Sequence, residues 1–311
     1  MNPIRLIFAG TPEIAVPLLR SLAEDKRFEL VLVVTQEDKP AGRRMELQPS
    51  AIKRTATELE FPLLQPKNIN DFGSIDHLRK LNVDLMVVMA YGQIFSKELL
   101  YISRHGCINV HASLLPKYRG ASPIQHALLD GEEKTGITIM HMEEQMDTGS
   151  AYDTFSISIT SADDAMTLRE KLGQLAGEKT PDVLLSIIRD NLKPEPQEGE
   201  ATYCQKIQKT DGKIDWKEPA LPLVNKIRAY AGWPGSFTFW NEKRLIITKA
   251  RVADVSYDDS PGTVFERDEV ILVTTGSGSV ELSELQLEGG KTQSIDEFVR
   301  GYPDFIGVSL G

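Results

Sequence analysis

Short apolar runs alternate with longer amphipathic stretches through the first half of the chain. The apolar runs predict strands at residues 4–9, 30–34, 84–90 and 106–111, and the stretches between them predict helices at residues 12–25, 50–59 and 123–129. Two further strands and a long helix are predicted at residues 136–142, 151–159 and 163–190. Fully apolar strands separated by helices are typical of a parallel sheet covered on both faces. The pattern therefore predicts a doubly wound, Rossmann-like α/β domain.

The pattern changes after residues 193–199, where two prolines and several charged residues interrupt the periodicity. Short β-type runs then follow at residues 236–240, 244–253, 262–266, 269–274 and 279–287. Strands at this spacing, with few helices between them, are typical of a small barrel of the OB type. We therefore expect an α/β domain at residues 1–190, a linker at 191–202 and a C-terminal OB-like β-barrel domain at 203–311.

The composition is that of an ordinary globular protein, with 41% hydrophobic and 26% charged residues in a chain of 311, a length that suits two domains. Cys107 and Cys204 lack the spacing to other Cys or His residues that zinc requires, so we expect no metal. No apolar run approaches the roughly 20 residues of a membrane span, and no signal peptide is visible. We expect a cytoplasmic monomer without a membrane partner.

The charge is distributed unevenly along the chain. The net charge is −10, but residues 203–251 contain ten basic and four acidic residues, a balance of +6, which leaves −16 for the rest. Lysines that only face solvent would explain such a segment if it stood alone. The contrast with the acidic remainder favours a surface for a polyanion.

Ligands of doubly wound sheets bind outside the carboxyl ends of the strands. The segments expected there include Gly10, Thr11 and the residues that follow the third and fourth strands. Residues 10–15 contain one glycine where a dinucleotide-binding loop needs three, and Pro12 lacks the amide that a pyrophosphate would contact. The sequence contains no phosphate-binding GxxxxGK[ST] motif. These features argue against a dehydrogenase or a nucleoside triphosphatase.

Asn109 and His111 lie two apart in a predicted strand, so their side chains point to one face. An amide can donate to an oxygen that becomes negative, and an imidazole can move a proton near neutral pH. Asp147 follows the next strand, and its carboxylate could orient the imidazole. Polar residues satisfied by the backbone, and an Asp that merely forms a turn, are the alternative interpretation. We interpret Cys107 as a small apolar residue, because no other histidine is near in sequence to activate it.

A longer motif surrounds this pair. The run from Asn109 to Gly120, N-V-H-A-S-L-L-P-K-Y-R-G, is followed by A-S-P-I-Q and later by D-T-G at residues 147–149, and it resembles the folate-dependent formyltransferases. Further landmarks are F-A-G-T-P at 8–12, D-K-P-A-G-R at 38–43, D-W at 215–216, I-R-A at 227–229 and L-Q-L-E-G-G-K at 285–291. Their order narrows the resemblance to the members that formylate initiator methionyl-tRNA, and the fit extends over nearly the whole chain.

The resemblance implies a reaction and a set of residues. The donor would be 10-formyltetrahydrofolate and the acceptor the α-amino group of methionine on initiator tRNA, with no metal. Asn109 and His111 would stabilise the oxyanion, while His111 and Asp147 would manage the proton. The folate would contact Ser113, Leu114, Leu115 and Pro116, and its pterin ring would contact Met89, Ala90, Tyr91, Gly92 and Ile94. The substrate would contact Gly10 and Thr11, Arg43 and Arg44 in the loop at residues 36–49, and Lys206, Lys209 and Lys213 in the C-terminal domain.

Two alternatives remain at this point. A related enzyme could formylate a small amine such as an aminosugar or glycinamide ribonucleotide, although such a substrate would not need a basic second domain. A noncatalytic RNA-binding protein could instead stack bases on Trp216, Tyr230, Trp233, Phe237, Phe239 and Trp240, although core packing is the more common role of such residues. In the loop, Met45 and Glu46 follow the two arginines where basic residues are typical, which leaves its phosphate contacts dependent on those arginines.

Overall fold

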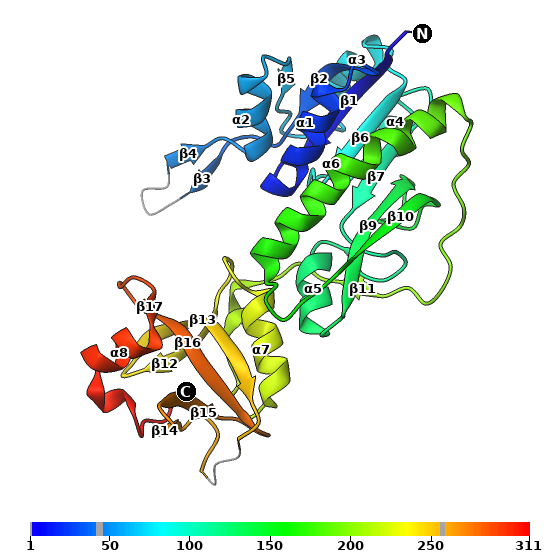
Figure 1. Cartoon of the computed structure of the whole chain (residues 1–311). Helices are drawn as coiled ribbons and strands as arrows, with labels where there is room; N and C mark the ends of the chain where they lie inside the picture. Colours follow the sequence, from blue (N-terminus) through cyan, green and yellow to red (C-terminus); the bar gives the residue numbers. More distant parts are fainter. Residues whose placement is uncertain (1, 42–45, 256–258) are drawn as a thin grey trace. The chain divides into compact units, whose positions relative to one another are not determined.

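The computed structural model describes residues 2–41, 46–255 and 259–311. Its internal contacts divide the chain into two compact units, whose elements are labelled in Figure 1. The first unit contains the residues up to Pro123, Lys134–Ser158 and Arg169–Cys204, and the second contains Ile124–Glu133, Ile159–Leu168 and Gln205–Gly311.

The first unit is built on a seven-stranded sheet in the order β10-β9-β7-β6-β1-β2-β5. The strands are β1 (Ile4–Gly10), β2 (Phe28–Val34), β5 (Leu63–Leu64), β6 (Leu85–Met89), β7 (Cys107–His111), β9 (Lys134–His141) and β10 (Ala151–Ser158). The five strands from β7 to β5 are parallel, as the apolar runs predict, whereas β9 and β10 are antiparallel to their neighbours. After β7 the chain re-enters the sheet from the carboxyl edge, so the last two strands alternate in direction.

Helices cover both faces of this sheet, as the doubly wound prediction requires. They are η1 (Glu13–Ala15), α1 (Val16–Glu24), α2 (Ala51–Glu58), α3 (Phe72–Lys80), α4 (Lys97–Leu100) and the long α6 (Ala165–Arg189). Figure 1 shows α1 and α6 side by side, and Ser21 Oγ of α1 donates to the Gly177 carbonyl of α6 at 2.7 Å. A Cβ at Gly177 would lie 2.9 Å from the Pro17 carbonyl, so this close approach depends on glycine. On the opposite face, Leu78 of α3 and Leu99 of α4 pack against buried strand residues.

Two small sheets complete the first unit. β3 (Lys39–Ala41) pairs with β4 (Glu46–Gln48), and β8 (Arg119–Gly120) pairs in parallel with β11 (Tyr203–Cys204). The segment 191–202, predicted as a linker, makes ordered contacts with this unit. Glu195 and Ala151 exchange two backbone hydrogen bonds of 2.8 Å. The predicted domain limits therefore stay a prediction, while the contacts of these residues are with the first unit.

The second unit is an antiparallel β domain, as the strand spacing predicts. Its strands are β12 (Ser236–Trp240), β13 (Lys243–Ala253), β14 (Val264–Arg267), β15 (Val270–Thr274), β16 (Ser279–Leu287) and β17 (Gln293–Ser294). They pair in the order β12-β13-β16-β15-β14, with β17 on β16. The helices are α5 (Pro123–Leu129), η2 (Lys209–Gly212), α7 (Ala220–Ala229), α8 (Ile295–Gly301) and η3 (Pro303–Phe305).

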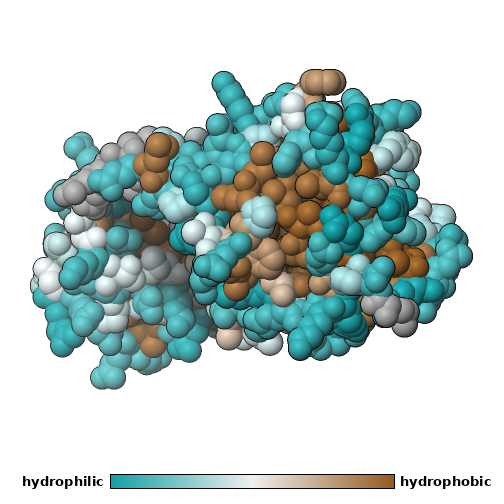
Figure 2. All heavy atoms as spheres, turned by 90° about the horizontal axis from the view of Figure 1, so that it is seen from above, coloured by the Kyte–Doolittle hydropathy of each residue, from teal (hydrophilic) through white to brown (hydrophobic). Residues whose placement is uncertain are grey.

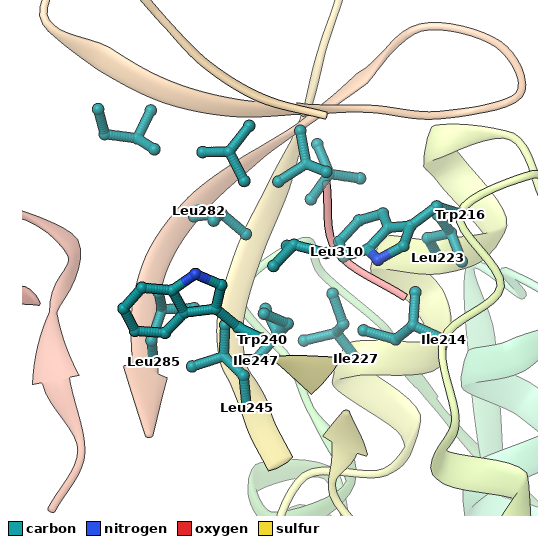
Figure 3. Packing of buried hydrophobic residues seen from close by; sticks show 14 of the residues in the cluster. Ile214, Trp216, Leu223, Ile227, Trp240, Leu245, Ile247, Leu282, Leu285 and Leu310 are labelled. Carbon is teal, nitrogen blue, oxygen red and sulfur yellow. The ribbon is translucent and has the colours of Figure 1, made fainter. Parts of the chain in front are cut away.

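The core of the second unit gathers around two tryptophans (Figure 3). Trp216 and Trp240 are buried among aliphatic residues of α7, β13 and β16. The Trp240 ring lies 5.7 Å from that of Phe298 in α8 and 5.3 Å from that of Phe305, in edge-to-face arrangements that aromatic rings favour. The last helices of the chain are therefore part of this core.

The surface is mainly polar. Hydrophilic side chains cover most of the face seen in Figure 2, and hydrophobic atoms gather in one area of it. Within the described ranges, none of the helices is both long enough and apolar enough to cross a membrane.

We predict that Phe298→Ala destabilises the second unit by about 3–5 kcal/mol, because it empties a fully buried site in the aromatic cluster. All three tryptophans of the chain, Trp216, Trp233 and Trp240, belong to the second unit, so urea unfolding followed by Trp fluorescence reports on it. Phe72→Ala, at a site that is 84% exposed, is the matched control and should change stability by less than about 0.5 kcal/mol. A decrease below about 1 kcal/mol for Phe298→Ala would contradict the packing described here.

Candidate active site

The carboxyl ends of three parallel strands lie side by side. Gly10 of β1 is opposite Met89 of β6, and Val88 of β6 is opposite Asn109 of β7. Thr11 Oγ1 donates to the Tyr91 carbonyl at 2.8 Å, which ties the segments after β1 and β6 together. The segments that the sequence analysis assigns to one crevice are therefore neighbours.

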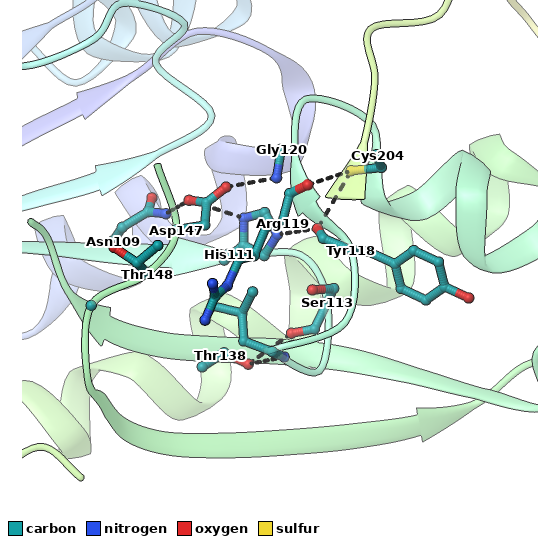
Figure 4. A network of polar contacts seen from close by, with 12 residues as sticks. Asn109, His111, Ser113, Tyr118, Arg119, Gly120, Thr138, Asp147, Thr148 and Cys204 are labelled. Atoms are coloured by element: carbon teal, nitrogen blue, oxygen red, sulfur yellow. Dashed lines mark hydrogen bonds and ion pairs between the residues drawn. The ribbon is translucent and has the colours of Figure 1, made fainter. Parts of the chain in front are cut away.

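Asn109, His111 and Asp147 come together at the end of β7 (Figure 4). Asn109 Nδ2 lies 3.5 Å from Asp147 Oδ1, and His111 Nδ1 lies 3.7 Å from the same oxygen. Both β7 side chains thus reach one carboxylate, as their spacing of two residues predicts. The His111 and Asp147 side chains are 7% and 12% exposed. The structure brings the three residues together, and the roles assigned to them stay a prediction.

The hydrogen bond at the other side of the imidazole determines which nitrogen carries the proton. His111 Nε2 lies 2.9 Å from the Tyr118 carbonyl, which can only accept, so Nε2 is the donor. In the neutral ring the lone pair is then on Nδ1, the nitrogen that faces Asp147. Nδ1 can accept a proton, and the cation formed would lie beside a carboxylate.

The Asp147 carboxylate is held by the backbone of β8. Its Oδ2 accepts a hydrogen bond of 2.8 Å from the Gly120 amide. Asp147 has a φ of 55°, in the left-handed region that Asp tolerates better than most residues. Two residues later, a Cβ at Gly149 would lie 1.8 Å from the His141 carbonyl, so glycine is required there. Turn formation and a positioned carboxylate, which were alternatives in the sequence, both apply to Asp147.

The loop that follows β7 is tied down by its own polar groups. Ser113 Oγ donates to the Lys117 carbonyl at 2.6 Å, and Thr138 Oγ1 donates to the Ser113 carbonyl at 2.8 Å. Ser113 and Pro116 are buried, whereas Leu114 and Leu115 are half-buried. Of the four residues predicted to contact folate, the two leucines therefore offer accessible surface.

The segment predicted to contact the pterin ring alternates between buried and exposed residues. Met89 and Tyr91 are buried in the core, while Ala90, Gly92 and Ile94 are exposed. Ala90 and Gly92 have φ values of 51° and 89°, so the chain turns sharply at each. These three exposed residues are the ones that can face a ligand.

The residues predicted to contact the acceptor substrate differ in accessibility. Gly10 is buried, Thr11 is half-buried, and Lys206, Lys209 and Lys213 are exposed. Arg43 and Arg44 lie outside the described residues. Among the aromatic residues considered for base stacking, Trp216, Tyr230 and Trp240 are buried, which argues against that role for them, whereas Trp233 and Phe239 are 54% and 37% exposed.

The two cysteines are buried and unpaired. Burial raises the pKa of the Cys107 thiol to about 12, so it is not a thiolate at neutral pH, in agreement with its interpretation as an apolar residue. Cys204 Sγ donates to the carbonyls of Tyr118 and Arg119 at 3.4 and 3.3 Å.

Three groups at the site were not found by reasoning from the sequence. They are the Tyr118 carbonyl, the Gly120 amide and the Gln197 side chain, which contacts the turn at Asp147. The first two lie inside the motif from Asn109 to Gly120, but they act through backbone atoms that no residue type announces. Gln197 lies in the segment that resembles a linker, where the sequence carries no signal for it.

Known families cover most of the chain. Residues 4–184 match the Formyl transferase family, and residues 206–303 match the Formyl transferase, C-terminal domain family. The methionyl-tRNA formyltransferase of Geobacter sulfurreducens is 41% identical over 313 residues, which cover 100% of this chain and 98% of that protein. The methionyl-tRNA formyltransferase of Caldanaerobacter subterraneus is 42% identical over 301 residues, which cover 96% of this chain and 97% of that protein.

Solved structures share the fold at lower identity. The N-formyltransferase of Helicobacter canadensis, in complex with folinic acid and dTDP-3-aminofucose, has a TM-score of 0.68 at 19% identity, covering 90% of this chain and 98% of that one. The methionyl-tRNA formyltransferase of Clostridium thermocellum has a TM-score of 0.55 at 17% identity, with the same coverage. The fold agrees with these structures, and the full-length sequence relatives identify the family. The chain therefore belongs to the methionyl-tRNA formyltransferase family.

Proposed function

We propose that this protein transfers a formyl group from 10-formyltetrahydrofolate to the α-amino group of methionine on initiator tRNA. The observation that carries the proposal is the convergence of Asn109, His111 and Asp147 at the end of β7, in a chain similar over its full length to methionyl-tRNA formyltransferases.

The residues at the strand ends fit a folate donor. Leu114 and Leu115 are half-buried and Ile94 is 72% exposed, so they supply apolar surface for a flat ring. Asn109 and His111 supply polar groups at a nearby strand end. When bound, the folate supplies a formyl carbon that is open to attack by an amine.

Asn109 suits the oxygen that becomes negative during this attack. Its Nδ2 lies 3.5 Å from Asp147 Oδ1, too far for a strong hydrogen bond, so the amide can donate to a formyl oxygen instead. A donor aimed at developing charge stabilises the transition state more than the ground state. The amide therefore acts as an oxyanion donor.

His111 suits the proton that the attacking amine must lose. Its Nε2 is occupied by the Tyr118 carbonyl, which leaves Nδ1 as the base. Asp147 Oδ1 lies 3.7 Å from Nδ1 and stabilises the imidazolium that forms. The division of labour needs no covalent intermediate on the protein.

The second unit suits an RNA acceptor. Lys206, Lys209 and Lys213 are exposed, and they belong to the segment 203–251 with its balance of +6. Each phosphate neutralised by such a side chain releases counterions, so a local positive surface can bind RNA although the whole chain is acidic.

The test is to incubate the protein with 10-formyltetrahydrofolate and charged initiator tRNA, and to look for formylmethionine. Asn109→Ala and His111→Ala should each lower the single-turnover rate by about 10²- to 10⁴-fold, because each removes a group that acts on the transition state.

His77→Ala, at an exposed histidine, is the control and should keep the parent rate. A parent protein that formylates a dTDP-linked aminosugar but not the tRNA would refute the proposed acceptor. Near-normal rates in both active-site variants would refute the proposed site.

Asp147→Asn should lower the single-turnover rate by about 10²- to 10⁴-fold, because the amide cannot stabilise the His111 cation. If Asp147 acts through His111, adding this change to His111→Ala should cost little more than His111→Ala alone. The measurement is a double-mutant cycle of single-turnover rates. Additive effects would mean that Asp147 has an independent role, such as shaping the turn.

Replacing Lys206, Lys209 and Lys213 by Gln should weaken tRNA binding and flatten its salt dependence, by up to about one unit of the log–log slope for each phosphate that the variant no longer neutralises. Affinity for charged tRNA is measured across a salt series, with folate affinity as a folding control. The matched variant replaces the exposed Lys26, Lys67 and Lys134 of the first unit, which removes the same charge elsewhere. Equal slopes in the two triple variants would mean that the first set only faces solvent.

A further inference from the structure

The residues 195–204, which we call the strap, follow the first unit closely. At one end Glu195 pairs with Ala151, and at the other end Cys204 lies opposite Gly120 in the β11–β8 pair. The Ala121 amide also donates to the Cys204 carbonyl at 3.2 Å. A segment that the sequence predicts to be a linker is thus fixed on both sides of the active site.

Gln197 joins three groups of the site from within the strap. Its Nε2 donates to the carbonyls of Asp147 and Gly149 at 2.9 and 2.8 Å. Its Oε1 accepts from Nε and Nη2 of Arg119 at 3.1 and 2.7 Å. One side-chain amide therefore connects the turn that presents the carboxylate with the residue that precedes the Gly120 amide.

The strap also supports the partner of His111. The Tyr118 amide donates to Thr202 Oγ1 at 2.9 Å, and Cys204 Sγ donates to the Tyr118 carbonyl at 3.4 Å. That carbonyl is the group that accepts from His111 Nε2. The strap therefore contacts the backbone on which both the imidazole and the carboxylate depend.

We propose that Gln197 is a positioning residue that holds the Asp147 carboxylate against His111. The reason is geometric. Asp147 has a left-handed φ of 55°, and two hydrogen bonds from one amide to the carbonyls of residues 147 and 149 fix the turn in that conformation. A misplacement of a catalytic group by about 1 Å can cost about 10²-fold in rate. The proposal rests on the proposed formyl transfer.

The experiment compares the full-length parent with Gln197→Ala and Gln197→Glu. Neither variant can donate the two hydrogen bonds to the turn, whereas Glu keeps an oxygen that can accept from Arg119. We expect kcat to fall by about 10- to 100-fold in both, with little change in KM for either substrate. Glu198→Ala, at the exposed neighbouring position in the strap, should match the parent.

A cycle with Asp147→Asn distinguishes positioning from general support of the fold. If Gln197 acts through Asp147, Gln197→Ala should cost less than about 3-fold further in kcat when Asp147 is already Asn. Additive effects, or a Gln197→Glu variant as active as the parent, would overturn the assignment. A parent without formyl transfer would refute the proposed function itself, whereas an active parent with unchanged Gln197 variants would refute the positioning role alone.

Discussion

A carboxylate whose side chain is 12% exposed is stable only when other groups replace the water that it gives up. Asp147 has the Gly120 amide on one oxygen, and Asn109 and His111 near the other. These partners come from β7 and β8, while the carboxylate comes from the turn after β9. The relative placement of three chain segments is therefore set by the needs of one buried charge.

The same need constrains the backbone around the site. Gly120 has a φ of 120°, and a Cβ there would lie 2.3 Å from the Cys204 carbonyl. Gly149 is equally restricted, by the His141 carbonyl. Close approach of these backbones is what allows an amide to reach the carboxylate, and it leaves no room for a side chain. The sequence motif thus contains residues selected for their lack of a Cβ as well as residues selected for their chemistry.

The parts of the structure that follow from local patterns could be predicted from the sequence. Apolar runs indicated the parallel strands of the sheet, and the two-residue spacing of Asn109 and His111 put both side chains on one face. The reversed direction of β9 could not be predicted, because it depends on where the chain re-enters the sheet. The role of Gln197 in the fold was also out of reach, since its partners include two carbonyls about 50 residues away, which any residue type would offer. Composition alone made its surroundings look like a linker.

The course of the strap affects how relatives in this family can exchange their C-terminal parts. The proline-rich residues 193–199 look like a natural joint between two modules, and a crossover just before them would take Gln197 from one parent while Asp147 and Arg119 came from the other. The contacts described here would then have to form between sequences that never evolved together. A chimera keeps the parental contacts of its carboxylate when the strap and the first unit share one origin, which places the junction after Cys204.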